Sequence, residues 1–234
     1  ELFRISLERC VLMSEFAAAC FDLDGTVADT GPIHLEAERL ALTRLGAGEL
    51  VADHPATFGM GVAPGMEALA QRYGFESGQA VLDVYEPIWE ELAATKTKPM
   101  PGAAQLLRKL RALEIPMVLV TSGNRSYAHG VLDAFGMREM FACTVTEDDV
   151  SELKPSTEPY LLAAKSLGVT SAECVGFEDS PSGIVSLTAA GMYSIAIGSA
   201  VDAARDQPPA DLHVVSLAEI TDAVLARLFI SRSV

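Results

Sequence analysis

Residues 17–30 read AAACFDLDGTVADT, an apolar run that ends on closely spaced aspartates. The run predicts a strand over residues 17–23, buried on both faces as in a parallel sheet. Asp22 and Asp24 stand at the carboxyl end of this strand. Two carboxylates at the end of a core strand repel each other, so the pattern indicates a site that gains from binding a cation.

Short apolar runs and amphipathic helical patterns alternate along most of the chain. Strands are predicted over residues 17–23, 116–121, 142–145, 174–177, 193–197 and 212–215. Helices are predicted over residues 105–113, 125–135, 158–167, 184–190 and 217–228. Nearly continuous apolar strands that alternate with helices are typical of a parallel sheet covered on both faces. We therefore predict an α/β fold with a Rossmann-like, doubly wound parallel sheet.

The interval between the first two strands is far longer than one crossover helix needs. It contains three further helical patterns, over residues 33–45, 64–73 and 78–94, between Gly31-Pro32 and the KPMPG stretch at 98–102. We predict an α-helical cap domain inserted at residues 32–98, with the core at 15–31 and 99–234. Met13 resembles a natural start, so residues 1–14 are interpreted as an N-terminal extension.

Composition excludes several classes of partner. The net charge of −15 and a sequence pI near 4.6 disfavour nucleic acid and anionic membranes, both of which attract Lys and Arg. The four cysteines form no CxxC pair and are expected to be small buried hydrophobic residues in a reducing compartment. Neither a secretory signal nor a membrane span is evident. We expect a cytoplasmic protein, a monomer or weak homodimer, with a small molecule as its partner.

Polar clusters follow the predicted strands. They lie at residues 22–26, 121–124 and 178–180, and a fourth, Lys154-Pro155, precedes the helix predicted at 158–167. Because ligands bind outside the carboxyl ends of the strands in open parallel sheets, we expect the clusters to converge.

Each cluster also has a simpler interpretation. Residues 22–33 do not form an EF-hand loop, because Val27 and Ile33 replace the required Gly and Glu. The aspartates could form a polar turn, and residues 121–124 could cap the next helix. Ser180-Pro181 fits an N-cap followed by Pro at the first helical position. Lys154 alone could be a solvated lysine, so the prediction rests on the four clusters together.

The combined chemistry indicates phosphoryl transfer. Asp22, Asp24 and Asp179, with Glu178 beside them, form an oxygen-rich set that suits Mg²⁺ and lacks the His or Cys expected for Zn²⁺. A lysine and a hydroxyl add donors for an anion. GxxxxGK[ST] and GxSxG motifs are absent. A carboxylate nucleophile remains, with a neighbouring carboxylate that moves the proton.

Four motifs in order carry a family resemblance. They are FDLDGT from Phe21, VTSGN from Val120, Lys154-Pro155 and GFEDSPSG from Gly176. Residues 16–228 resemble the haloacid dehalogenase-like hydrolase superfamily. The DTGPIH stretch at residues 29–34 is similar to the branch that contains β-phosphoglucomutase and sugar-phosphate phosphatases.

The resemblance assigns roles to the motif residues. It implies Asp22 as the nucleophile and Asp24 as the general acid/base. It implies phosphate contacts from Thr121, Ser122 and Lys154, and Mg²⁺ ligands from Asp22, the Asp24 carbonyl, Asp179 and Glu178. In this family the acid at Asp24 favours phosphate esters over dehalogenation.

Cap residues bear on the substrate. His34 is expected at the hinge, and Met60 and Val62 lie where related caps select substrates. Val62 stands near the position of an arginine in β-phosphoglucomutase. The absence of that arginine weakens the interpretation of the chain as a mutase. We expect a Mg²⁺-dependent phosphatase of a small phosphorylated metabolite, most simply a sugar phosphate. The alternatives are a phosphomutase and a non-catalytic phosphate-binding regulatory domain.

Overall fold

A computed structural model describes residues 16–47, 57, 62–198 and 209–229. Its main sheet has six parallel strands. In spatial order they are β5 (Cys143–Val145), β4 (Met117–Val120), β1 (Ala18–Phe21), β6 (Cys174–Glu178), β7 (Tyr193–Ile197) and β8 (Leu212–Val214). The predicted α/β fold with a parallel sheet is confirmed. No helix in the described part of the chain has the length and apolarity to span a membrane.

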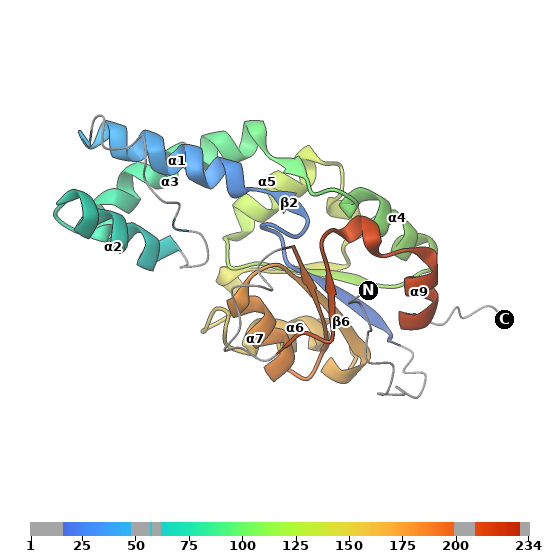
Figure 1. Cartoon of the computed structure of the whole chain (residues 1–234). Helices are drawn as coiled ribbons and strands as arrows, with labels where there is room; N and C mark the ends of the chain where they lie inside the picture. Colours follow the sequence, from blue (N-terminus) through green and yellow to red (C-terminus); the bar gives the residue numbers. More distant parts are fainter. Residues whose placement is uncertain (1–15, 48–56, 58–61, 199–208, 230–234) are drawn as a thin grey trace, which may run out of the picture.

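Helices cover both faces of the sheet (Figure 1). α4 (Ala103–Ala112), α5 (Arg125–Ala134) and α9 (Asp222–Leu228) pack on one face, and α6 (Glu158–Ser166) and α7 (Pro181–Ala189) on the other. Side chains along β1 alternate between the two cores: Ala19 and Phe21 join the first, Ala18 and Cys20 the second. Both faces of β1 are buried, which explains its unbroken apolar sequence.

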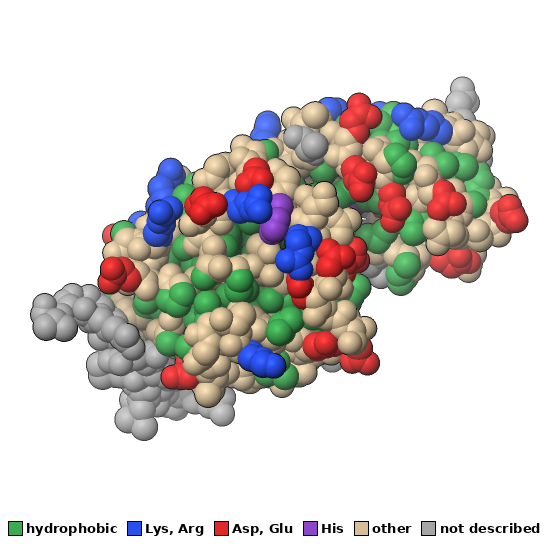
Figure 2. Space-filling view, turned by 180° about the vertical axis from the view of Figure 1, so that it is seen from behind, with side chains coloured by type: hydrophobic (Ala, Val, Ile, Leu, Met, Phe, Trp, Pro, Cys, Tyr) green, Lys and Arg blue, Asp and Glu red, His purple; other side chains and the backbone are tan. Residues whose placement is uncertain are grey.

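α1 (Gly31–Arg44), α2 (Val62–Tyr73) and α3 (Gly78–Lys96) form a separate group, here called the three-helix lobe. Figure 1 shows the lobe at one end of the molecule. Its helices share a hydrophobic cluster of their own, which includes Ile33, Leu42, Met66 and Ile88. The face in Figure 2 carries acidic side chains on both the lobe and the core, as the net charge of −15 leads one to expect.

A two-stranded antiparallel ladder joins the two connections between lobe and core. β2 (Ala28–Asp29) pairs with β3 (Lys98–Pro99). The ladder is too short for a sequence period to reveal, and it lies beside both predicted cap boundaries. Asp29, opposite Lys98, belongs to this connection.

Two other segments differ from prediction. Residues 217–228 form a 3-10 turn, η5 (Leu217–Glu219), and then α9, because the Thr221 side chain accepts a hydrogen bond from the Val224 N–H and starts a new helix. α7 begins three residues earlier than predicted, with Ser180 as its N-cap and Pro181 as its first residue. Further 3-10 turns are η2 (Arg138–Met140), η3 (Glu147–Asp149) and η4 (Ser171–Glu173).

Candidate active site

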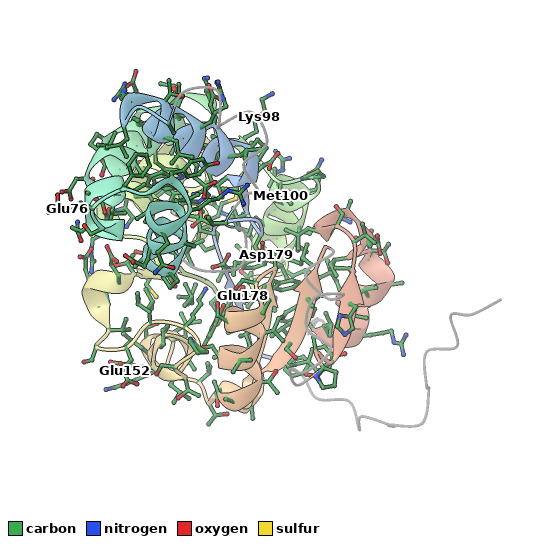
Figure 3. The ribbon with its side chains drawn as sticks, turned by 60° about the vertical axis from the view of Figure 1, so that its left-hand side comes forward. Glu76, Lys98, Met100, Glu152, Glu178 and Asp179 are labelled. Atoms are coloured by element: carbon green, nitrogen blue, oxygen red, sulfur yellow. The ribbon has the colours of Figure 1, made fainter. Side chains whose placement is uncertain are left out.

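Strand register brings the polar clusters together. Phe21 in β1 lies opposite Leu119 in β4 and Phe177 in β6, so the residues that follow emerge at the same edge of the sheet. The Asp22 N–H donates to the Phe177 carbonyl at 3.0 Å. Figure 3 shows Glu178 and Asp179 at the end of β6, between the core and the lobe.

Lys154 is the buried cation of this site. Its Nζ donates to Asp22 Oδ1 at 2.6 Å, to Glu178 Oε1 at 2.6 Å and to the Val120 carbonyl at 2.8 Å. These contacts use all three N–H donors of the ammonium group. Burial acts to lower the pKa of Lys154, but Asp22 and Glu178 outweigh it and raise that pKa, so the lysine stays charged. Lys154 therefore holds the Asp22 carboxylate directly.

Glu178 is fully buried, and both its oxygens are engaged. Tyr160 donates its hydroxyl to Oε1 at 2.7 Å, and the Ser180 hydroxyl donates to Oε2 at 3.0 Å. A Cβ on Gly183 would lie 1.9 Å from the Glu178 carboxyl carbon, so only glycine lets α7 approach so closely. Tyr160 was not predicted: nothing in the sequence distinguishes it from a core aromatic residue of α6.

Asp179 projects into the loop that follows β1. A Cβ on Gly25 would lie 2.0 Å from Asp179 Oδ2, and Gly25 has a φ of 80°, which favours glycine. Asp179 Oδ1 is buried without a hydrogen-bond partner among the described residues. Burial, followed by the charges of Glu178 and Asp24, raises the pKa of Asp179 to about 8. A buried carboxylate oxygen without a partner is suited to a cation.

Asp22, Glu178 and Asp179 together fit a divalent metal. Each offers one oxygen, and these atoms lie within 4.8 Å of one another. Burial, and then the charge of Glu178, raise the pKa of Asp22 well above its usual range despite Lys154. A bound cation would favour the ionised carboxylates. The oxygen-only donors match the preference of Mg²⁺.

The second predicted motif follows β4. Thr121 is buried, and its Oγ accepts from the Gly123 N–H at 3.0 Å, which leaves the hydroxyl proton free to be donated. Asn124 caps α5, its Oδ1 accepting from the Tyr127 N–H at 2.9 Å. Ser122 is exposed and makes no hydrogen bond within the described structure. Thr121 is therefore the buried hydroxyl of this motif, and Ser122 is the exposed one.

Asp24 makes a contact that sequence reasoning missed. Tyr127, in the first turn of α5, donates its hydroxyl to Asp24 Oδ1 at 2.6 Å. Burial, and then the charge of Asp24, raise the pKa of Tyr127, so the phenol remains protonated. The only available signal was the position of Tyr127 six residues after Thr121, too weak to predict a contact across 103 residues.

The predicted lobe residues have different placements. His34 hydrogen-bonds through Nδ1 to the Tyr85 hydroxyl, and its ring centroid is 5.1 Å from that of Trp89. Val62 is the first residue of α2 and is 46% exposed. Met60 lies outside the described residues. Of the two described residues, His34 is linked to the site through ring contacts: Trp89 also packs against Tyr127, whose hydroxyl donates to Asp24.

Comparisons with known proteins show which proteins this chain is similar to. Residues 16–191 match the family model described as haloacid dehalogenase-like hydrolase. Hexitol phosphatase A of Escherichia coli is 34% identical over 208 residues, covering 86% of this chain and 91% of the relative. A phosphoglycolate phosphatase of Chromobacterium violaceum is 31% identical over 221 residues, covering 90% of this chain and 97% of the relative.

A solved structure shows the same similarity. The crystal structure of a hydrolase of this family from Deinococcus radiodurans, with bound phosphate and sodium, has a TM-score of 0.71 and 26% sequence identity. The match covers 92% of this chain and 97% of that one.

Proposed function

Because the chain belongs to the haloacid dehalogenase-like hydrolase family, we propose that it is a Mg²⁺-dependent phosphatase of small phosphate esters, with Asp22 as nucleophile. One observation carries the proposal. The Asp22 carboxylate is held at Oδ1 by buried Lys154, beside the oxygens of Glu178 and Asp179. Asp22 Oδ2 has no hydrogen-bond partner in the described part of the chain and remains available to attack.

The reaction would proceed in two displacements. Asp22 attacks phosphorus, the bond from phosphorus to the ester oxygen breaks, and Asp24 gives its proton to the departing alcohol. Asp24 then removes a proton from water, the water oxygen attacks phosphorus, and the Asp22 carboxylate departs. Phosphate is released, and both carboxyl groups return to their starting states.

Other residues would bind and balance charge. Thr121 donates its hydroxyl to a phosphoryl oxygen, while Lys154 keeps Asp22 oriented. Mg²⁺, held by Asp22 and Asp179 with the Asp24 carbonyl, would supply positive charge for the phosphoryl group. The three-helix lobe, hinged at the β2–β3 ladder, would act as the cap that covers the substrate.

The lobe favours an uncharged leaving group. Burial lowers the pKa of His34 against the opposing charges of Asp24 and Glu38, so the imidazole is neutral near pH 7. Burial, and then the carboxylate charges of Glu38 and Asp24, raise the pKa of neighbouring Tyr85. A second anionic group on the substrate would meet this negative field. A sugar or polyol phosphate is therefore favoured over phosphoglycolate or a bisphosphate.

Phosphate release identifies the substrate class. We would assay a panel of sugar, hexitol and other polyol phosphates beside phosphoglycolate and para-nitrophenyl phosphate, each with Mg²⁺ and with chelator. Asp22→Asn protein, purified identically, controls for contaminating phosphatases. We expect Mg²⁺-dependent release that is fastest with polyol phosphates and absent in the variant.

The other outcomes assign the alternatives. A preference for phosphoglycolate would refute the leaving-group argument but keep the phosphatase. Isomer interconversion that needs a bisphosphate, without net release, would identify a phosphomutase. Phosphate binding without turnover of any substrate would indicate a non-catalytic domain.

A further inference from the structure

Among the described residues, Tyr127 alone makes a hydrogen bond to the Asp24 carboxylate, and neighbouring residues fix the position of its ring. Asn124 caps the helix turn that carries it. Gly123 leaves room for the ring, because a Cβ at that position would lie 2.8 Å from Tyr127 Cδ1. The hydroxyl then reaches Asp24 Oδ1 at 2.6 Å. The backbone of the second motif thus aims a phenol at the proposed acid/base.

The other side of the Tyr127 ring belongs to the lobe. Its centroid is 4.2 Å from that of Trp89 in α3, with the planes at 55°. Trp89 in turn contacts His34 in α1, and its Nε1 is buried without a hydrogen-bond partner among the described residues. The indole is therefore held by packing. Tyr127 is partly buried and packs against both the hydrophobic cluster of the core and that of the lobe.

We propose that Tyr127 is a positioning residue: it fixes the Asp24 carboxylate and is itself held by Trp89 of the lobe. The inference rests on the proposed role of Asp24. With Oδ1 occupied by the phenol, Oδ2 is the oxygen that carries the proton to the leaving group. Because Trp89 supports the phenol, Asp24 is correctly oriented when the lobe packs against the core.

Leaving-group dependence tests this role. The value of kcat/KM covers the steps through phosphoryl transfer to Asp22, in which an alkyl alcohol needs a proton and para-nitrophenolate needs little. Tyr127→Phe should lower kcat/KM for a hydrolysed alkyl phosphate by about tenfold, the loss of one well-placed hydrogen bond. For para-nitrophenyl phosphate the loss should be about threefold or less. Asp24→Asn should likewise lower kcat/KM more for the alkyl phosphate than for para-nitrophenyl phosphate, with larger losses on both.

Two controls separate the hydroxyl from general packing. Trp89 is the only tryptophan in the sequence, so its emission spectrum reports the ring contact directly and should not change in Tyr127→Phe. Tyr193→Phe removes a hydroxyl from a half-buried tyrosine of β7 and should leave both rates unchanged. Trp89→Ala, which removes the support, should reproduce the selective loss on the alkyl ester.

Three results would overturn the inference. They are wild-type rates in Tyr127→Phe, equal losses on both substrates, or an unaffected alkyl ester rate in Trp89→Ala. Wild-type protein that hydrolyses no ester would refute the proposed function and this inference with it. An active wild type with an unaffected Tyr127→Phe would refute the inference alone.

Discussion

Lys154→Met should destabilise the metal-free protein by about 3–5 kcal/mol at neutral pH, since removing one partner of a buried pair leaves the other charge uncompensated. The lysine side chain is 4% exposed, and Nζ lies 2.6 Å from oxygens of both Asp22 and Glu178. Because two carboxylates lose their cation, we expect the upper part of that range.

A surface ion pair with the same nitrogen–oxygen distance provides the control. Lys109 Nζ lies 2.6 Å from Asp222 Oδ1, but the two side chains are 43% and 85% exposed. Exposed pairs contribute less than about 1 kcal/mol, so Lys109→Met should have a small effect. Both variants remove a lysine charge that lies 2.6 Å from a carboxylate oxygen; they differ in burial and in that Lys154 contacts two carboxylates while Lys109 contacts one.

The penalty of Lys154→Met should grow with pH. The folded-state pKa of Asp22 is already raised, and loss of Lys154 raises it further. A raised folded pKa contributes stability that is present below the unfolded value, near 3.9, and is lost as pH rises through the folded value. The variant can relieve the unpaired charge by taking up a proton at low pH, and this relief disappears as pH increases.

Urea unfolding followed by circular dichroism measures these differences. Wild type, Lys154→Met and Lys109→Met would be compared with chelator at constant ionic strength, at about pH 5.5 and pH 8. If Lys154→Met costs no more than Lys109→Met at either pH, the argument from burial is refuted.

Two further predictions concern the same site. In metal-free protein, the stability that the raised pKa of Asp179 contributes is fully present below about pH 4 and is lost as pH rises through about 8. Asp179→Asn should therefore flatten the fall of Tm between these pH values and reduce the rise in Tm on adding Mg²⁺. Differential scanning fluorimetry measures both, and an unchanged dependence of Tm on pH would argue against this role. Gly183→Ala should cost about 1–3 kcal/mol in urea unfolding, because the new Cβ overlaps Glu178. Gly130→Ala in α5 meets no atom within 4 Å and should stabilise the protein by about 0.5–1 kcal/mol, so equal effects of the two substitutions would contradict the packing argument.

Much of the fold was predictable because burial leaves apolar patterns in the sequence. β1 and β4 are buried on both faces and read as unbroken apolar runs. Capping residues such as Asn124 and Ser180 mark where helices begin. The β2–β3 ladder was missed, because two-residue strands leave no period.

The acids of the site were predictable for a different reason. Carboxylates at strand ends stand out against an apolar background, and a parallel sheet gathers strand ends at one edge. Contacts made by ordinary-looking aromatic residues were not predictable. Tyr127 and Tyr160 reach Asp24 and Glu178 through tertiary packing, which a single sequence does not encode locally. The resemblance assigned Lys154 to the substrate phosphate, and this stays a prediction; what the sequence did not show is that its three donors contact Asp22, Glu178 and the Val120 carbonyl.

The stereochemical course at phosphorus tests the central claim most directly, namely that Asp22 attacks the ester. A phosphorothioate ester made chiral at phosphorus with ¹⁷O and ¹⁸O would be hydrolysed in ordinary water, and the configuration of the released thiophosphate, which then carries sulfur and three different oxygen isotopes, would be determined by ³¹P NMR. Two successive in-line displacements, first by Asp22 and then by water, predict net retention of configuration. Net inversion would mean that water attacks the ester directly, and it would contradict Asp22 as the nucleophile.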